Sequence, residues 1–216
     1  MLELEPSDCA LVVVDLQRYY VEVESSFSRY SQMRYPGVMD YILGRCTDLV
    51  LPNVGRLLAA CREGGYPVVF LRLCGEQEDR SDLHPHFRDL HRAGLARGFA
   101  DIYPLRSDPW SDVSPRIAPV DGEQVFCKTT YSAFTSSGID AWLRQRSVRK
   151  LIFTGLATSQ CVETTARDAA DRAYSIFHVD DALADYEDIT HRASLFASRA
   201  VCGGGLCNTE AVLAAL

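Results

Sequence analysis

The chain has 216 residues, 47% of them hydrophobic and 24% charged, which favours one soluble globular domain over residues 1–216 with a sizeable core. Its formal net charge of -7 would repel a phosphate backbone, so we expect no nucleic acid partner. No apolar run approaches the roughly 20 residues that span a bilayer, and the basic start of a signal peptide is missing, so we expect no membrane partner and a cytoplasmic location.

Short apolar runs rich in β-branched residues recur along the chain and predict buried strands. The first is Ala10–Asp15, and similar runs follow at 67–71, 124–128, 151–154 and 175–179. Helical patterns occur at 53–62, 86–92, 140–146, 160–173, 188–199 and 209–216. This alternation predicts an α/β domain with a mainly parallel sheet.

Three segments depart from the alternation. The stretch between Tyr20 and Leu51 is rich in Tyr, Ser and Met with weak periodicity, and predicts an irregular insertion or a partner surface. The segment 74–119 is charged and rich in proline, and predicts a loop around the short helix at 86–92. Gly203-Gly204-Gly205 fits no phosphate-binding motif, which disfavours a nucleotide-binding domain; we expect a strand-to-helix turn there.

Three strand ends carry residues suited to chemistry. Asp15 closes the first predicted strand, Lys128 closes the third, and Cys161 begins a helix after the fourth. Ligands bind beyond the carboxyl ends of parallel strands. A thiol at a helix N-terminus near an ammonium is expected to favour the thiolate, and a carboxylate can accept its proton. Cys161 alone is weak support, because the chain has eight cysteines without a C-x-x-C pair and we expect most to be free core thiols.

The order and wording of three motifs strengthen this interpretation. Val13–Gln17, Cys127–Phe134 and Gly155–Ala169 resemble the isochorismatase-like cysteine hydrolase family, and the resemblance extends over nearly the whole chain. It implies a three-layer α-β-α fold with a mainly parallel six-stranded sheet. The wording around Cys161 looks most like members that act on ureidoacrylate, biuret or N-carbamoylsarcosine.

The resemblance also implies site residues and a mechanism. Asp15, Lys128 and Cys161 would form a catalytic triad, and the backbone N–H groups of Ala157 and Cys161 an oxyanion hole after a cis peptide at Leu156–Ala157. Cys161 would attack the carbonyl of a small amide or ureido substrate, forming a thioester and releasing ammonia or an amine. A homodimer or homotetramer is implied, without a cofactor.

Other activities of the fold are disfavoured by particular residues. True isochorismatases cleave a vinyl ether and lack the cysteine, so Cys161 argues against that reaction. Nicotinamidase-like members carry an Asp-x-His metal motif after the second strand, where this chain has Leu71–Gly75. Asp82, His84 and His86 only superficially resemble ligands, so we expect no metal. A non-catalytic binding domain is disfavoured by the intact triad.

Four side chains are candidates for substrate contacts. Gln17, Tyr20 and Thr158 lie in the motifs that resemble the family. Arg72, near the end of the second strand, either binds a substrate carboxylate as a planar fork or forms a structural ion pair.

Overall fold

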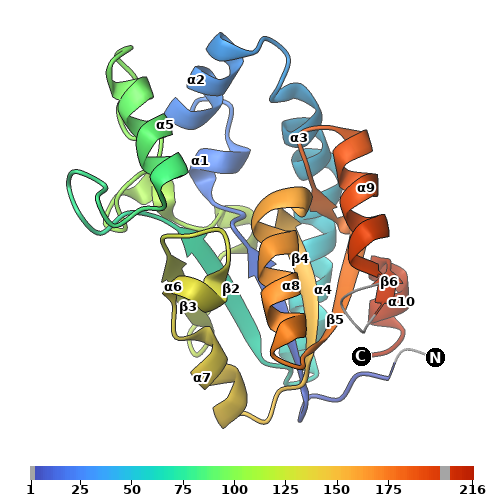
Figure 1. Ribbon diagram of the computed structural model, residues 1–216. Helices are drawn as coiled ribbons and strands as arrows, with labels where there is room; N and C mark the ends of the chain where they lie inside the picture. Colours follow the sequence, from blue (N-terminus) through green and yellow to red (C-terminus); the bar gives the residue numbers. More distant parts are fainter. Residues whose placement is uncertain (1–2, 200–204) are drawn as a thin grey trace.

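The computed structural model describes residues 3–199 and 205–216, which fold around a central sheet (Figure 1). All paired strands run parallel, in the order β3-β2-β1-β4-β5-β6. The strands are β1 (Cys9–Val14), β2 (Val68–Leu73), β3 (Gln124–Lys128), β4 (Lys150–Leu156), β5 (Ser175–Ala184) and β6 (Gly205–Cys207). The predicted parallel six-stranded sheet is confirmed.

The continuous apolar run of β1 is explained by burial on both faces. Cys9, Leu11 and Val13 point into one core, and the alternate residues of the strand point into the other. Helices α4 (Leu51–Glu63) and α10 (Thr209–Leu213) cover the first face. Helices α7 (Ile139–Gln145) and α8 (Glu163–Asp171) cover the second, in front of the sheet in Figure 1. The three-layer prediction therefore holds.

The stretch between Tyr20 and Leu51 is helical, so the predicted irregular insertion is wrong. It contains α1 (Arg18–Val21), α2 (Ser26–Arg34) and α3 (Asp40–Arg45), followed by a π-helical turn that leads into α4. Helix α2 buries only Phe27, Ser28 and Tyr30, so its sequence lacks a full apolar stripe. The start of this helix could have been predicted from Ser25, because serine is a favoured N-cap residue. Its side chain accepts a hydrogen bond from the Ser28 N–H.

The remaining predictions are mostly confirmed. Segment 74–119 is loop around α5 (Pro85–Leu95), with short 3-10 turns at 109–111 and 115–117. The predicted helix at 188–199 is α9 (Asp188–Arg199), whereas α6 (Ala133–Ser136) was not predicted. Gly205 begins β6 rather than lying in a turn; Gly203 and Gly204 lie outside the described residues.

The cysteines of the described ranges are all free thiols, as expected; Cys202 lies outside them. Across residues 3–199 and 205–216, none of the helices combines the length and the apolar character needed to cross a membrane.

Candidate active site

The sheet order places three chemically active residues at one edge. Strands β1 and β4 are neighbours, and the chain leaves them in different directions to build the two halves of the sheet. Asp15 follows β1 directly, with a φ of 50°, in the left-handed region that non-glycine residues rarely adopt. Cys161 lies in the π-helical turn η4 (Thr158–Val162) after β4, and Lys128 ends β3. Parallel α/β proteins bind ligands in the crevice beyond the carboxyl ends of such neighbouring strands.

The three predicted residues are in direct contact around the lysine. Lys128 Nζ lies 2.8 Å from Asp15 Oδ2 and 3.3 Å from Cys161 Sγ, and donates to the Thr130 carbonyl at 3.1 Å. Asp15 and Lys128 have no exposed surface, and Cys161 is 4% exposed. One ammonium therefore contacts both a carboxylate and a thiol in a buried site.

Burial dominates the electrostatics of these groups. Desolvation raises the pKa of the Cys161 thiol above its ordinary value, although the Lys128 charge opposes this. Burial also raises the pKa of Asp15 against the same opposing charge. For Lys128, burial acts to lower the pKa, but the charges of Asp15 and Cys161 outweigh it and raise the value. Burial thus opposes the expected thiolate and the Lys128 ammonium favours it, beside a carboxylate that can take the thiol proton.

The backbone before Cys161 is held close to β1. The Leu156–Ala157 peptide is cis. Gly155 has a φ of 112°, and a Cβ at this position would collide with the Val14 carbonyl oxygen. Glycine is thus required where β4 passes the strand that carries Asp15.

The backbone N–H groups at this turn were predicted to form an oxyanion hole. The Ala157 N–H donates no hydrogen bond within residues 3–199 and 205–216. The Ala157 carbonyl accepts from the N–H groups of Gln160 and Val162, and the Cys161 N–H is not among its donors. These features suit an anion site, and the oxyanion hole remains a prediction.

Comparison with known proteins decides the family. The model of the isochorismatase domain matches residues 9–211. The chain belongs to the isochorismatase family. Ureidoacrylate amidohydrolase RutB of Variovorax paradoxus (strain S110) is 31% identical over 196 residues, covering 88% of this chain and 71% of the relative. RutB of Pseudomonas syringae pv. syringae (strain B728a) is 29% identical over 198 residues, covering 89% and 74%.

A solved structure of a cysteine hydrolase from Pseudomonas syringae pv. phaseolicola 1448A is also similar. Its TM-score is 0.78 at 26% identity, and the match covers 100% of this chain and 95% of that one. The architecture of this isochorismatase-family chain is thus shared along its whole length.

Asp185 supports the turn of this isochorismatase-family site, and sequence reasoning missed it. It follows β5, is 1% exposed, and accepts the Ser159 N–H at 2.7 Å and the Tyr186 N–H at 2.8 Å. The predicted strand at 175–179 was too short: β5 continues to Ala184, so only the structure places Asp185, like Asp15, directly after a buried strand.

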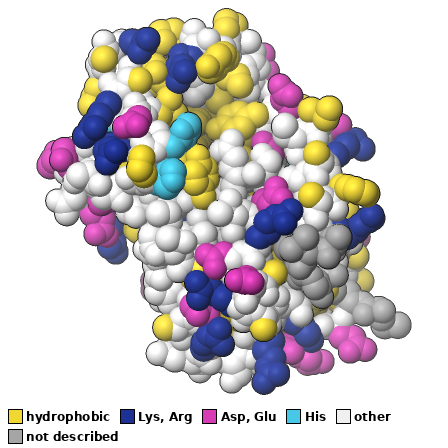
Figure 2. Space-filling view, viewed as in Figure 1, with side chains coloured by type: hydrophobic (Ala, Val, Ile, Leu, Met, Phe, Trp, Pro, Cys, Tyr) yellow, Lys and Arg dark blue, Asp and Glu magenta, His cyan; other side chains and the backbone are white. Residues whose placement is uncertain are grey.

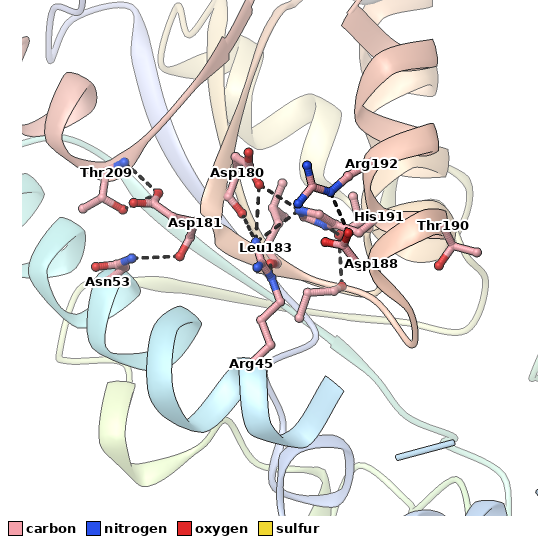
Figure 3. A network of polar contacts seen from close by, with 12 residues as sticks. Arg45, Asn53, Asp180, Asp181, Leu183, Asp188, Thr190, His191, Arg192 and Thr209 are labelled. Carbon is pink, nitrogen blue, oxygen red and sulfur yellow. Dashed lines mark hydrogen bonds and ion pairs between the residues drawn. The ribbon is translucent and has the colours of Figure 1, made fainter. Parts of the chain in front are cut away.

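Thr158, a predicted substrate contact, instead anchors the turn. Its hydroxyl oxygen lies 3.0 Å from the Ala184 carbonyl and 2.8 Å from His191 Nδ1. Figure 3 shows the network behind it, in which His191 Nε2 lies 2.8 Å from Asp180 and Arg45 joins the same carboxylate at 3.3 Å. The Thr158 side chain is fully buried, and its hydroxyl faces this network.

The polar groups of Gln17 and Arg72, two further predicted substrate contacts, also have partners within the protein. The Gln17 amide donates to the Leu73 and Ser111 carbonyls at 3.1 and 2.7 Å and accepts the Leu73 N–H at 2.7 Å. Arg72 donates to the Ser111 carbonyl at 2.8 Å and forms an ion pair with Asp112 at 3.1 Å. For Arg72 the structure thus gives the ion pair that was its alternative interpretation.

Tyr20 belongs to an aromatic cluster next to the site. It is 7% exposed and packs against Tyr19 and Phe27, with ring centroids 4.0 and 4.8 Å away. Burial raises its pKa, and the nearby Cys161 charge adds to the effect. Tyr20 thus supports the wall beside the nucleophile.

A cavity of about 200 Å³ opens in front of this cluster. In Figure 2 it is a hollow of apolar side chains with histidine at its edge. Gln160, which precedes Cys161, forms part of its wall. The remaining lining residues, which lie on α2, on α5 and in the loops around the site, are Phe27, Tyr30, Ser31, Arg34, Tyr35, Val38, His86, Phe87, Leu90, Tyr103 and Tyr186.

The residues that superficially resembled metal ligands have other contacts. Asp82 accepts the Glu76 N–H at 2.8 Å, and His84 accepts the His86 N–H at 3.2 Å as the N-cap of α5. In the described part of the chain, no group of three or more His, Cys, Asp or Glu side chains is arranged to hold a metal ion.

Proposed function

We propose that this chain is a cysteine-dependent amidohydrolase that cleaves a C–N bond of a small ureido or carbamoyl substrate through a thioester. The observation that carries the proposal is the position of Lys128 Nζ, 2.8 Å from the Asp15 carboxylate and 3.3 Å from the Cys161 thiol. The RutB relatives, named for ureidoacrylate hydrolysis, support C–N bond cleavage and the ureido class.

The first half-reaction uses Asp15 as a base. Asp15 takes the proton of the Cys161 thiol as sulfur attacks the substrate carbonyl carbon, forming the S–C bond. Lys128 stays protonated and stabilises the negative charge that remains in the site. The oxyanion of the tetrahedral intermediate is held by backbone N–H groups of Ala157 and Cys161.

Release of the amine and hydrolysis of the thioester complete the reaction. Protonated Asp15 gives its proton to the leaving nitrogen as the C–N bond breaks, so ammonia or an amine departs and an acyl thioester remains. Water then gives a proton to Asp15 and attacks the thioester carbonyl. Collapse releases the acid or carbamate product, and Cys161 regains its proton.

The test is an ammonia-release screen over primary amides, ureas and N-carbamoyl compounds, with mass spectrometry of the intact protein for an acyl adduct. We expect Cys161→Ala to abolish release while the circular dichroism spectrum is unchanged. Cys61→Ala, at a core thiol remote from the site, serves as the matched control. Turnover retained by the Cys161 variant would contradict the mechanism.

A further inference from the structure

The Thr158 hydroxyl lies at the start of the turn that carries the nucleophile. Thr158 begins η4, directly after Ala157 and three residues before Cys161. Its hydroxyl donates to the Ala184 carbonyl at 3.0 Å and lies 2.8 Å from His191 Nδ1. Because a hydroxyl has one hydrogen, Nδ1 is the donor when that hydrogen points to Ala184. One side chain therefore ties the start of the turn to both β5 and α9.

His191 is held from its other side by charged groups. Its Nε2 lies 2.8 Å from Asp180 Oδ1, and Arg45 Nη2 lies 3.2 Å from the same nitrogen (Figure 3). Arg45 also donates to the Leu183 and Asp180 carbonyls at 2.8 and 2.9 Å, which joins α3 to β5. The imidazole is 2% exposed. Partners on both ring nitrogens fix its orientation, so Thr158 is bonded to a side chain that cannot turn freely.

We infer that His191 is a positioning residue: through the Thr158 hydroxyl it holds the turn that carries Cys161 in the arrangement that the transition state requires. This inference rests on the proposed function. Displacement of a catalytic group by about 1 Å can lower a rate about a hundredfold. Backbone N–H donors stabilise an oxyanion only when they point to the place where its charge develops. Loss of the contact should therefore lower kcat more than substrate affinity.

Two amide substitutions separate the two sides of the imidazole. His191→Asn places an amide group where Nδ1 stands and keeps the partner of Thr158, whereas His191→Gln places it where Nε2 stands and keeps the partner of Asp180. The probe is p-nitrophenyl acetate, whose acetyl group is transferred to the Cys161 sulfur as nitrophenolate leaves. After subtraction of the release by Cys161→Ala, kcat should fall about ten- to hundredfold in His191→Gln, with KM nearly unchanged. In His191→Asn it should stay near the parent value.

Thr158→Val removes the same hydrogen bond from the other partner. It should lower kcat by a similar factor, and its combination with His191→Gln should be no slower than either single variant, because both break one link. Thr209→Val is the matched control: the buried Thr209 hydroxyl donates to Asp181 at 2.8 Å, at the start of α10 (Figure 3), so its loss should cost stability without lowering kcat. Additive losses in the double variant, or equal losses in His191→Asn and His191→Gln, would overturn the inference.

Amide hydrogen exchange separates this inference from the proposed function. The N–H groups of Gln160 and Val162 donate to the Ala157 carbonyl, so their exchange rates report how firmly the turn is held. These rates should rise in His191→Gln and stay unchanged in His191→Asn, whether or not the ester is cleaved. Unchanged exchange in His191→Gln would overturn the inference. Equal nitrophenolate release by the parent protein and Cys161→Ala would instead contradict the proposed nucleophile.

Discussion

Cys127 and Cys161 both lie beside Lys128 but differ in their electrostatic surroundings. Burial raises the pKa of Cys161. The half-buried Cys127 has its pKa lowered to about 7, first by hydrogen bonding with the Cys74 thiol and further by the charges of Arg72 and Arg106, against the effect of burial. The lowered pKa of Cys127 therefore favours its reaction with alkylating agents over that of Cys161.

We predict that iodoacetamide at pH 7 labels Cys127 before Cys161. The lowered pKa of Cys127, about 7, favours its thiolate over those of the other cysteines, and its labelling rate should fall as the pH is lowered. Core thiols such as Cys46, whose pKa is raised to about 12, should react last. Peptide mass spectrometry over time measures the order, with Cys127→Ser as the control. Faster labelling of Cys161 would show that its thiolate is populated without substrate.

The pKa of Asp15 predicts the acid limb of the activity profile. Burial raises this pKa above 3.8, and only the ionised carboxylate can accept the thiol proton. Activity should therefore be full above the raised pKa and be lost as the pH falls through it. Measurement of kcat/KM against pH should place the acid limb above the ordinary aspartate value. Asp15→Asn should lower kcat by about 10²–10⁴. An acid limb at or below 3.8 would contradict this assignment.

At the scale of elements, the loop after β1 is held by one side-chain amide. Gln17 joins this loop to the end of β2 and to the Ser111 carbonyl through three buried hydrogen bonds. The same loop begins with Asp15, so Gln17 positions the carboxylate indirectly.

We expect Gln17→Leu to lower the free energy of unfolding by about 1–3 kcal/mol, because it leaves the buried Leu73 N–H without an acceptor, whereas the Leu73 and Ser111 carbonyls keep Tyr19 and Arg72 as donors. Urea unfolding gives the value, and substrate kinetics on the folded variant separate the two roles considered for Gln17. A higher KM without any loss of stability would identify a substrate contact instead. The matched control is Gln32→Leu, since Gln32 makes its hydrogen bonds at the surface of α2.

The elements also show which predictions sequence patterns support. Strands such as β1 could be predicted, because burial on both faces requires a continuous apolar run in the sequence. Helix α2 could not be predicted from periodicity, because it buries few residues and lies over the site rather than on the sheet. The aromatic wall of the cavity was missed for the same reason, whereas the strand ends led directly to Asp15 and Lys128.

At the scale of the molecule, the site depends on strand order, which no local pattern contains. Lys128 lies at the end of β3 and reaches Asp15, after β1, across the intervening strand β2. Cys161 follows β4, the neighbour of β1 on the other side. The family motifs supplied this grouping; spacing alone could not. Contacts such as Thr158 with His191 depend on tertiary packing between segments distant in sequence, so the side chains of Thr158 and Gln17 could not be assigned in advance.

The two-core sheet also buries a titratable group remote from the site. His178 on β5 is 3% exposed, stacks on Phe153 with centroids 6.0 Å apart, and its Nε2 has no partner within the described residues. Burial lowers its pKa from 6.5 to about 4, with a smaller opposing effect of Glu163 and a supporting one of Arg167. The folded chain therefore keeps this histidine neutral where the unfolded chain protonates it.

This difference predicts acid destabilisation of the whole fold. The contribution of His178 to the free energy of unfolding is fully present above pH 6.5 and is lost as the pH falls toward about 4. The loss amounts to about 2 kcal/mol by pH 5. Replacing His178 by Phe, which keeps the ring against Phe153, should remove that part of the pH dependence. Urea unfolding of both proteins at pH 7.5 and pH 5 measures it, because carboxylates such as Asp15 contribute equally to each and cancel in the difference. Equal losses of stability in the two proteins would show that His178 is protonated within the folded core.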